Sequence, residues 1–259
     1  MRKTQRVPPL VLGLFAIGGG LALLYLAVRI LHVPSSSIQK WTDLDDERSV
    51  ASWFSSMQFL IPALLLTPVL LDAFRRREPY RWALLALALL FVVLSADEAI
   101  EFHEWVGYES DILLPHDDRN LTVFHTTGVW MFVVGIPFLV VAGVLLRQAH
   151  AAFRRVPGVM TRLVVGGAIW LSGALGLESL SNFIGPDDVW LNITEVFFEE
   201  TLEMFGVTVM VWSMYQLLVG LGFRWELGRA GARDAVLEVD AAPAEVGGEV
   251  EAAIDTAAR

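Results

Sequence analysis

The amino-acid sequence predicts an all-α membrane protein, built as a bundle of six helices that cross the bilayer. Two observations indicate this fold class: 55% of the 259 residues are hydrophobic, and the mean hydropathy is +0.54. A third is that the apolar residues form runs of the ~20 residues that a helix needs to cross ~30 Å of hydrocarbon. We therefore expect six spans, at about 9–31, 50–73, 81–105, 122–147, 160–184 and 193–222.

Each span is predicted from its length and its flanking residues. The first follows the basic stretch MRKTQRVPP and is too long for a signal peptide, so we expect it to stay uncleaved. The second carries Pro62 and Pro68, which can bend a helix. The third, fourth and fifth fit one crossing each, and the sixth is long enough to tilt or to project past the lipid. Solid apolar runs argue against a β-barrel, whose strands alternate apolar and polar residues.

Basic residues mark one side of the predicted bundle. They precede span 1, lie between spans 2 and 3 and between spans 4 and 5, and follow span 6: Arg2, Lys3, Arg6, Arg75, Arg76, Arg77, Arg81, Arg147, Arg154, Arg155, Arg162, Arg224, Arg229 and Arg233. The other connections, 42–48, 108–120 and 185–190, are acidic, and we expect the first of them, with Asp45, to be solvated. Because short loops rich in Lys and Arg stay in the cytoplasm, both termini are predicted to be cytoplasmic.

The predicted organisation is one transmembrane domain over residues 1–228 and a disordered, acidic cytoplasmic tail over residues 229–259. The tail has many small residues and no aromatic ones, so it cannot bury enough apolar surface to order itself. The Arg-, Ala- and Leu-rich composition favours a multi-pass protein of the bacterial inner membrane. The lipid bilayer is then the main partner, nucleic acid is not expected as one, and the oligomeric state stays open.

Nine acidic residues lie in or next to spans 3, 5 and 6, where a charged side chain costs ~3 kcal/mol or more at mid-depth. They are Asp97, Glu98, Glu101, Glu104, Glu178, Glu195, Glu199, Glu200 and Glu203. All are predicted near the outer ends of their spans, as is His125 at the start of span 4. The i, i+4, i+8 spacing puts Glu195, Glu199 and Glu203 on one face. The same geometry points Glu200 elsewhere and turns His103 away from the acid-bearing face of its helix.

The predicted function depends on what neutralises these acids. Spans 3 to 6 carry no Lys or Arg near this layer, and crowded carboxylates in a low dielectric cannot all ionise, so we expect a metal ion or shared protons. The candidate metal ligands are Asp97, Glu98, Glu101, His125, Glu178, Glu199 and Glu203, supported by His103, Glu104, Asn182 and Glu195. Carboxylates with imidazole suit a divalent ion such as Zn, Fe or Mn, and an oxygen-only subset suits Ca. The absence of cysteine disfavours Cu(I).

Three classes of function fit such a site. A metal-dependent hydrolase acting on a lipid-like substrate would activate water at the metal, with Glu101 or Glu178 as the catalytic base. Several spans with buried Asp, Ser and His resemble the intramembrane ceramidase-type hydrolases, although the paired His-x-x-x-His of those enzymes is absent. The alternatives are a channel or transporter for protons or cations that uses the same acids, and a metal-binding sensor without catalysis. The inner halves of spans 3 to 6 offer little polar lining, which counts against a continuous pathway.

Overall fold

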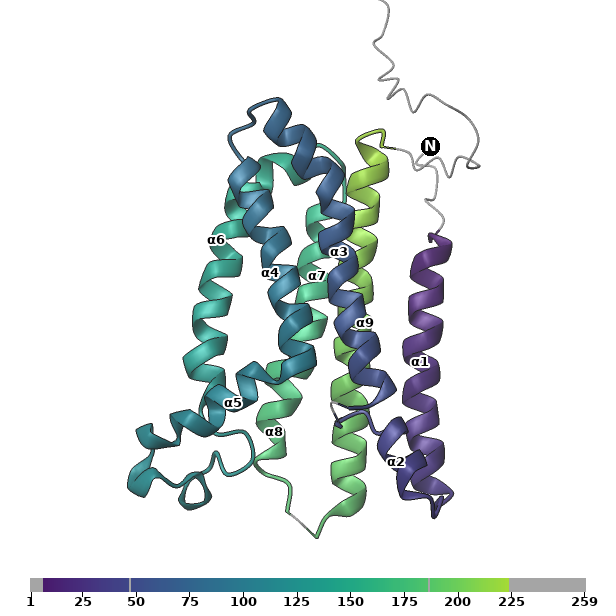
Figure 1. Cartoon of the computed structure of the whole chain (residues 1–259), viewed down its shortest axis with the longest axis vertical. Coiled ribbons are helices and arrows are strands. Elements are labelled where there is room, and N and C mark those ends of the chain that lie inside the picture. Colours follow the sequence, from purple (N-terminus) through teal and green to yellow (C-terminus); the bar gives the residue numbers. More distant parts are fainter. Residues whose placement is uncertain (1–6, 47, 186, 224–259) are drawn as a thin grey trace, which may run out of the picture. The chain divides into compact units, whose positions relative to one another are not determined.

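The computed structural model describes residues 7–46, 48–185 and 187–223, and these residues form helices, turns and loops without a strand (Figure 1). The longer helices are α1 (Pro9–Ile30), α3 (Val50–Arg75), α4 (Arg81–Ile100), α6 (Ile136–Phe153), α7 (Val159–Leu171) and α9 (Val189–Gly220). Shorter elements are α2 (Ser36–Thr42), α5 (Phe102–Glu109), α8 (Glu178–Ser181), the 3₁₀ turns η1 (Ser110–Leu113), η2 (Pro115–Asp117) and η3 (Arg119–Leu121), and the π-helical η4 (Met131–Gly135) and η5 (Ser172–Leu177).

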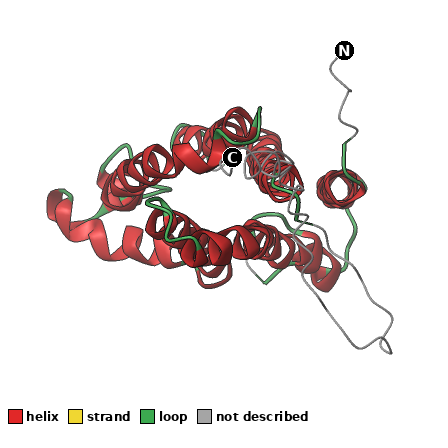
Figure 2. Ribbon diagram, turned by 90° about the horizontal axis from the view of Figure 1, so that it is seen from above, coloured by secondary structure: helices red, strands yellow, loops and turns green. Residues whose placement is uncertain are grey.

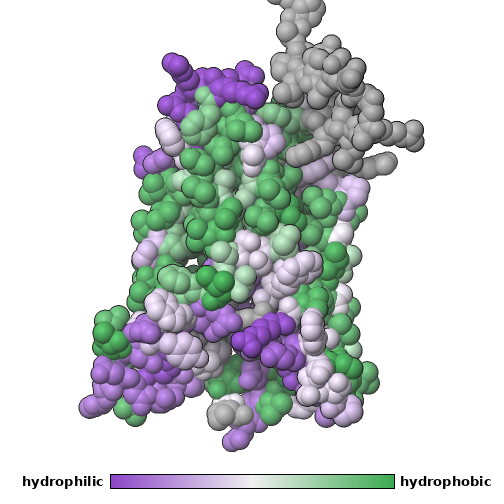
Figure 3. Space-filling view, viewed as in Figure 1, coloured by the Kyte–Doolittle hydropathy of each residue, from purple (hydrophilic) through white to green (hydrophobic). Residues whose placement is uncertain are grey.

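Six helical segments are long and apolar enough to cross a membrane, which confirms the predicted fold class. They are Pro9–Ile30, Val50–Arg75, Arg81–Ile100, Met131–Phe153, Val159–Ser181 and Val189–Gly220. Figure 3 shows apolar side chains over the middle of this face of the bundle and hydrophilic ones gathered towards its two ends. The chain thus has the pattern of a multi-pass membrane protein.

Helix α9 is the centre of the bundle, because it packs against α1, α3 and α7. Its inner side chains, among them Met204, Val211 and Leu217, are fully buried. Helix α4 pairs with α3 on one side and with α6 on the other, and α1 stands at the edge of the bundle (Figures 1 and 2). The interior is therefore enclosed by α3 and α4 on one side and by α7 and α9 on the other.

Glycine allows α7 and η5 to approach α9 closely. A Cβ on Gly166 would lie 2.8 Å from the carbonyl oxygen of Gly206 and 2.8 Å from the backbone nitrogen of Met210. A Cβ on Gly173 would lie 2.7 Å from the carbonyl oxygen of Glu199. All three distances are shorter than a carbon atom tolerates, so this interface requires residues without a side chain.

The two ends of the bundle differ in charge. The turn between α3 and α4 and the turn between α6 and α7 lie at the same end as the start of α1 and the finish of α9 (Figure 1). Ion pairs hold this end, with Arg76 Nε 2.8 Å from Asp72 and the Arg155 guanidinium 2.8 Å from Glu78. The acidic stretches lie at the opposite end, so the charge segregation expected from the sequence is present in the fold.

Two predicted spans have different boundaries in the structure. The third was expected to reach residue 105, but α4 ends at Ile100 because Glu101 adopts a left-handed backbone conformation (φ 57°) and redirects the chain into α5. The fourth was expected from residue 122, but its helical part begins at Met131. The amides of Thr126 and Thr127 donate to the side chain of Asn182 instead of to helix carbonyls. The predicted tail, 229–259, lies outside the described residues.

Candidate functional site

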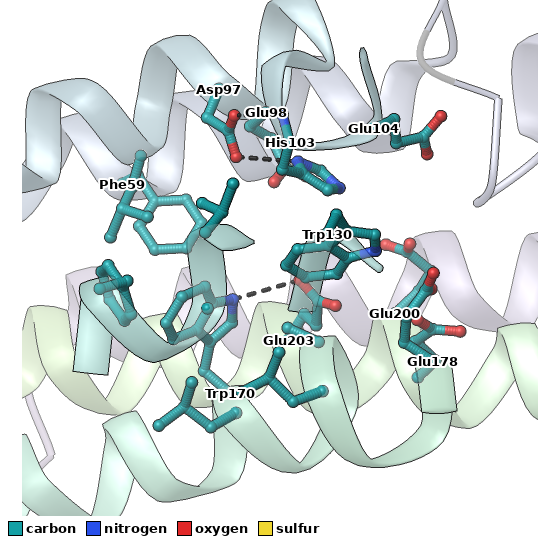
Figure 4. A pocket seen from close by; sticks show the side chains of 18 of the residues that line it. Phe59, Asp97, Glu98, His103, Glu104, Trp130, Trp170, Glu178, Glu200 and Glu203 are labelled. Carbon is teal, nitrogen blue, oxygen red and sulfur yellow. Dashed lines mark hydrogen bonds and ion pairs between the residues drawn. The ribbon is translucent and has the colours of Figure 1, made fainter. Parts of the chain in front are cut away.

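The described helices enclose a cavity of about 150 Å³ towards the acidic end of the bundle (Figure 4). We call it the acid cavity, because eight carboxylates line it: Asp45, Asp97, Glu98, Glu104, Glu178, Glu199, Glu200 and Glu203. His103 also lines it, whereas no Lys or Arg does so among the residues that the structure describes. The acids come from the α2–α3 connection and from α4, α5, α8 and α9, so five separate parts of the chain build one site.

One wall of the acid cavity contains an ion pair between α4 and α5. Asp97 accepts a hydrogen bond from the backbone amide of His103 at 3.0 Å, and its other oxygen lies 2.9 Å from the His103 Nδ1. The imidazole also packs against the Trp130 ring, with 4.7 Å between ring centroids. Burial alone would lower the pKa of His103, but the hydrogen bond and the charge of Asp97 raise it to about 9. His103 is therefore protonated at neutral pH and neutralises Asp97.

This pair is expected to make stability depend on pH. The folded-state pKa of His103 is about 9, above the ~6.5 of a free imidazole, so the stabilisation is fully present below about pH 6.5 and is lost as the pH rises through about 9. Thermal unfolding of the wild type and of His103→Gln in detergent, from about pH 6 to pH 10, measures it. The difference between their melting temperatures should be largest near pH 6 and should disappear near pH 10. His150→Gln, at an exposed site on α6, is the control, and a gap independent of pH would contradict the assignment.

The opposite wall carries four glutamates from α8 and α9: Glu178, Glu199, Glu200 and Glu203. Glu199 is only 8% exposed, and its carboxyl group interacts with those of Glu178 and Glu195. Glu203 accepts a hydrogen bond from the Trp170 indole at 3.2 Å. Unlike Asp97, none of these four acids forms an ion pair among the described residues, and the His103 side chain in the lining is already paired with Asp97. Such a wall needs protons or a bound cation, because neighbouring carboxylates in a low dielectric cannot all be charged.

Aromatic side chains line the inner end of the acid cavity. The Trp170 ring meets Phe59 and Phe138 edge-on, each with 5.5 Å between centroids. Trp130 lies between the two acidic walls (Figure 4), is 8% exposed, and its indole N–H has no hydrogen-bond partner among the described residues. The cavity thus combines acids at its mouth and sides with aromatic faces at its inner end.

The structure brings together most of the site residues predicted from the sequence. Seven of them line the acid cavity: Asp97, Glu98, His103, Glu104, Glu178, Glu199 and Glu203. Four do not: Glu101 terminates α4, His125 lies exposed in the turns before η4, Asn182 is buried against those turns, and Glu195 lies one helical turn from Glu199. In the described residues, no group of three or more His, Asp or Glu side chains is arranged to hold a metal ion. The metal site, with Glu101 and Glu178 as catalytic groups, stays a prediction.

Sequence reasoning missed two lining acids. Asp45 belongs to the acidic connection between α2 and α3, which was expected to be solvated, but it lines the cavity. Glu200 was expected to point away from the acidic face of its helix, yet it lines the cavity beside Glu199 and Glu203. The sequence contained a signal for each acid. Asp45 is followed directly by a second acid, and Glu200 directly follows Glu199, which was itself predicted to belong to the site.

Comparison with known proteins gives one family match. Residues 11–219 match the model of a family described as a domain of unknown function (DUF8692). No curated protein and no solved structure matches the chain. The matched range runs from α1 to α9 and includes every residue that lines the acid cavity.

Proposed function

The chain belongs to the DUF8692 family of domains, and we propose that this membrane protein binds a cation in its acid cavity. One observation carries the proposal: four glutamates of α8 and α9 face the cavity and none of them forms an ion pair among the described residues, while His103 on the facing wall is already paired with Asp97. Charged groups at this depth are costly unless they are paired. The cavity of about 150 Å³ between these acids is large enough for a cation, which supports the proposal.

The cavity favours binding over conduction. Asp45 and Glu104 line it together with the other acids, and the aromatic rings of Phe59, Phe138 and Trp170 line its inner end without adding a charged group. A hydrolase for a lipid-like substrate and a cation transporter would both need the binding step first, so binding is the function to test before either.

Cation binding is expected to stabilise the purified protein. A ligand at a hundredfold its dissociation constant adds about 2.7 kcal/mol to the free energy of unfolding, which is about 5–10 °C in melting temperature for a domain of this size. Melting curves in detergent at constant ionic strength, with Mg²⁺, Ca²⁺, Mn²⁺, Zn²⁺ and small organic ammonium ions added one at a time, measure the shift. Glu199→Gln should abolish it, since the central carboxylate of the unpaired wall is lost.

Glu109→Gln is the matched control, because Glu109 is exposed on α5 and does not line the cavity. It should retain the full cation effect. The proposal is wrong if no cation of either class stabilises the wild type, or if Glu109→Gln loses the effect as completely as Glu199→Gln.

A further inference from the structure

The size of the acid cavity indicates a molecule rather than a bare ion. A cavity of about 150 Å³ accommodates a compound of roughly six non-hydrogen atoms, the size of benzene. A metal ion would instead need several ligand atoms drawn around one point, and no such group of three side chains exists in the described part of the chain. The arrangement therefore fits a small organic cation better than it fits a metal ion.

The aromatic inner end supports the same conclusion. Phe59, Phe138 and Trp170 form a continuous ring cluster beside the glutamates. Organic ammonium groups are attracted both to carboxylates and to aromatic faces. Divalent metal ions prefer oxygen ligands and retain water, so aromatic faces offer them little.

Trp130 adds a requirement that a simple cation does not meet. Its indole N–H is buried at the cavity and lacks an acceptor among the described residues. Buried donors are almost always paired, and this one lies between the two acidic walls (Figure 4). An oxygen atom on the ligand would satisfy it, whereas an ammonium group or a metal ion has no lone pair to offer.

We propose that the acid cavity binds an organic ammonium compound that also carries an oxygen acceptor, the chemistry of an amino alcohol. This inference rests on the proposed cation binding and names its ligand class. The ammonium group lies between Glu199 and Glu203, next to the Trp170 ring that Glu203 contacts, and the oxygen accepts the hydrogen bond of the Trp130 indole. No covalent step is involved.

Such a headgroup has two sources, a free small amine or a lipid. A second hollow, of about 270 Å³, is lined by residues of η4, η5 and the segments next to them, most of them apolar, such as Phe132, Leu139 and Phe183. Leu175 lines both hollows, and a Cβ on Gly135 would lie 3.4 Å from its Cδ2 atom. Leu175 is thus the partition between the headgroup site and a surface suited to a hydrocarbon chain.

The test compares matched ligands on the full-length protein in lipid nanodiscs at neutral pH. Ethanolamine carries both features, ethylamine lacks the oxygen, and ethylene glycol lacks the charge. Ethanolamine should bind about tenfold more tightly than ethylamine, the effect of one hydrogen bond to a buried donor. Ethylene glycol should not bind. Trp130→Phe should bring the two amines to equal affinity, while Trp105→Phe, at an exposed position on α5, should leave the tenfold difference.

The outcomes separate this inference from the proposed function. If metal ions stabilise the protein and the amines do not, cation binding stands and the ligand class is wrong. Equal affinities of ethanolamine and ethylamine for the wild type would also overturn it, because water would then be the partner of Trp130. If no cation of any kind binds, both proposals fail.

A long-chain amino alcohol, used as a test ligand, shows whether the headgroup comes from a lipid or from a free amine. A lipid source is supported if this compound binds at least about tenfold more tightly than ethanolamine and if Leu175→Trp weakens its binding but Leu180→Trp does not. Leu180 is the control because it is exposed on α8 and lines neither hollow. A free amine is supported if ethanolamine binds more tightly than the long-chain amino alcohol and if Leu175→Trp does not change the affinity for ethanolamine. Both results uphold the ligand class.

Discussion

Replacing Gly166 with alanine is expected to destabilise the bundle by about 3 kcal/mol or more, at the upper end of the cost of overpacking. The new Cβ would lie 2.8 Å from two backbone atoms of α9, the Gly206 oxygen and the Met210 nitrogen. Backbone atoms in a packed helix cannot rotate away as a side chain can, so α7 would have to move from α9. Thermal or denaturant unfolding in detergent measures the loss.

Gly167 provides an adjacent control, because a Cβ there would meet nothing within 4 Å. Gly167→Ala should be neutral or stabilise by up to about 1 kcal/mol, since alanine is the better helix former. Equal stabilities of Gly166→Ala and Gly167→Ala would show that the two helices are not so closely packed. The same logic applies to Gly173 and Gly176 in η5, of which only the first faces α9.

Replacing Asn182 with alanine is expected to release the turns that carry Trp130. The Asn182 Oδ1 atom accepts from the amides of Thr126 at 3.1 Å and Thr127 at 3.2 Å, and its Nδ2 atom donates to the Thr127 hydroxyl at 3.0 Å. Alanine would leave two backbone donors unpaired, at about 1–3 kcal/mol for each that stays buried. Hydrogen exchange over residues 122–130 should rise, and ligand binding in the acid cavity should weaken because Trp130 is no longer fixed.

Asn182→Asp separates the two halves of this interaction, because it keeps the acceptor for the two amides and replaces the Nδ2 donor with a second acceptor oxygen. Its exchange rates should lie closer to those of the wild type than to those of the alanine variant. Asn192→Ala, at an exposed position on α9, is the control. If Asn182→Ala left exchange in 122–130 unchanged, these hydrogen bonds would not hold the segment.

The helix count and the clustering of acids were predictable because both depend on composition and spacing over long stretches. The direction in which individual acidic side chains point was not predictable. In α9, successive residues turn by ~100°, so Glu195, Glu199 and Glu203 lie within ~80° of one another, with Glu200 ~60° beyond Glu203. The cavity faces Glu199, Glu200 and Glu203, so its centre is displaced from the stripe that the spacing singled out. Periodicity identifies a stripe, but the neighbouring helices decide which side of it is open.

The two histidines show why local breaks escape sequence reasoning. A helix continued through Glu101 turns His103 away, but the left-handed conformation of Glu101 returns it to Asp97. A helix started at residue 122 would bring His125 inward, but the Asn182 side chain holds this segment in turns. Glu101 is not a residue type that usually takes a left-handed conformation, and Asn182 acts on a segment 55 residues away in the sequence, which only the fold brings near.

The π-helical segment η5 preserves the direction of the helix that follows it. A π-turn holds one residue more than an α-turn, so the extra residue is taken up within η5 and does not turn Glu178 by the ~100° that one residue adds in an α-helix. Deleting one residue between Ser172 and Leu177 would restore an α-helix and leave Glu178 directed close to its present side. Deleting one residue from α7 would instead turn Glu178 by ~100° away from Glu199, although every acid would still be present. The number of residues in α7, and not only their type, is therefore part of what places Glu178 in the acid cavity.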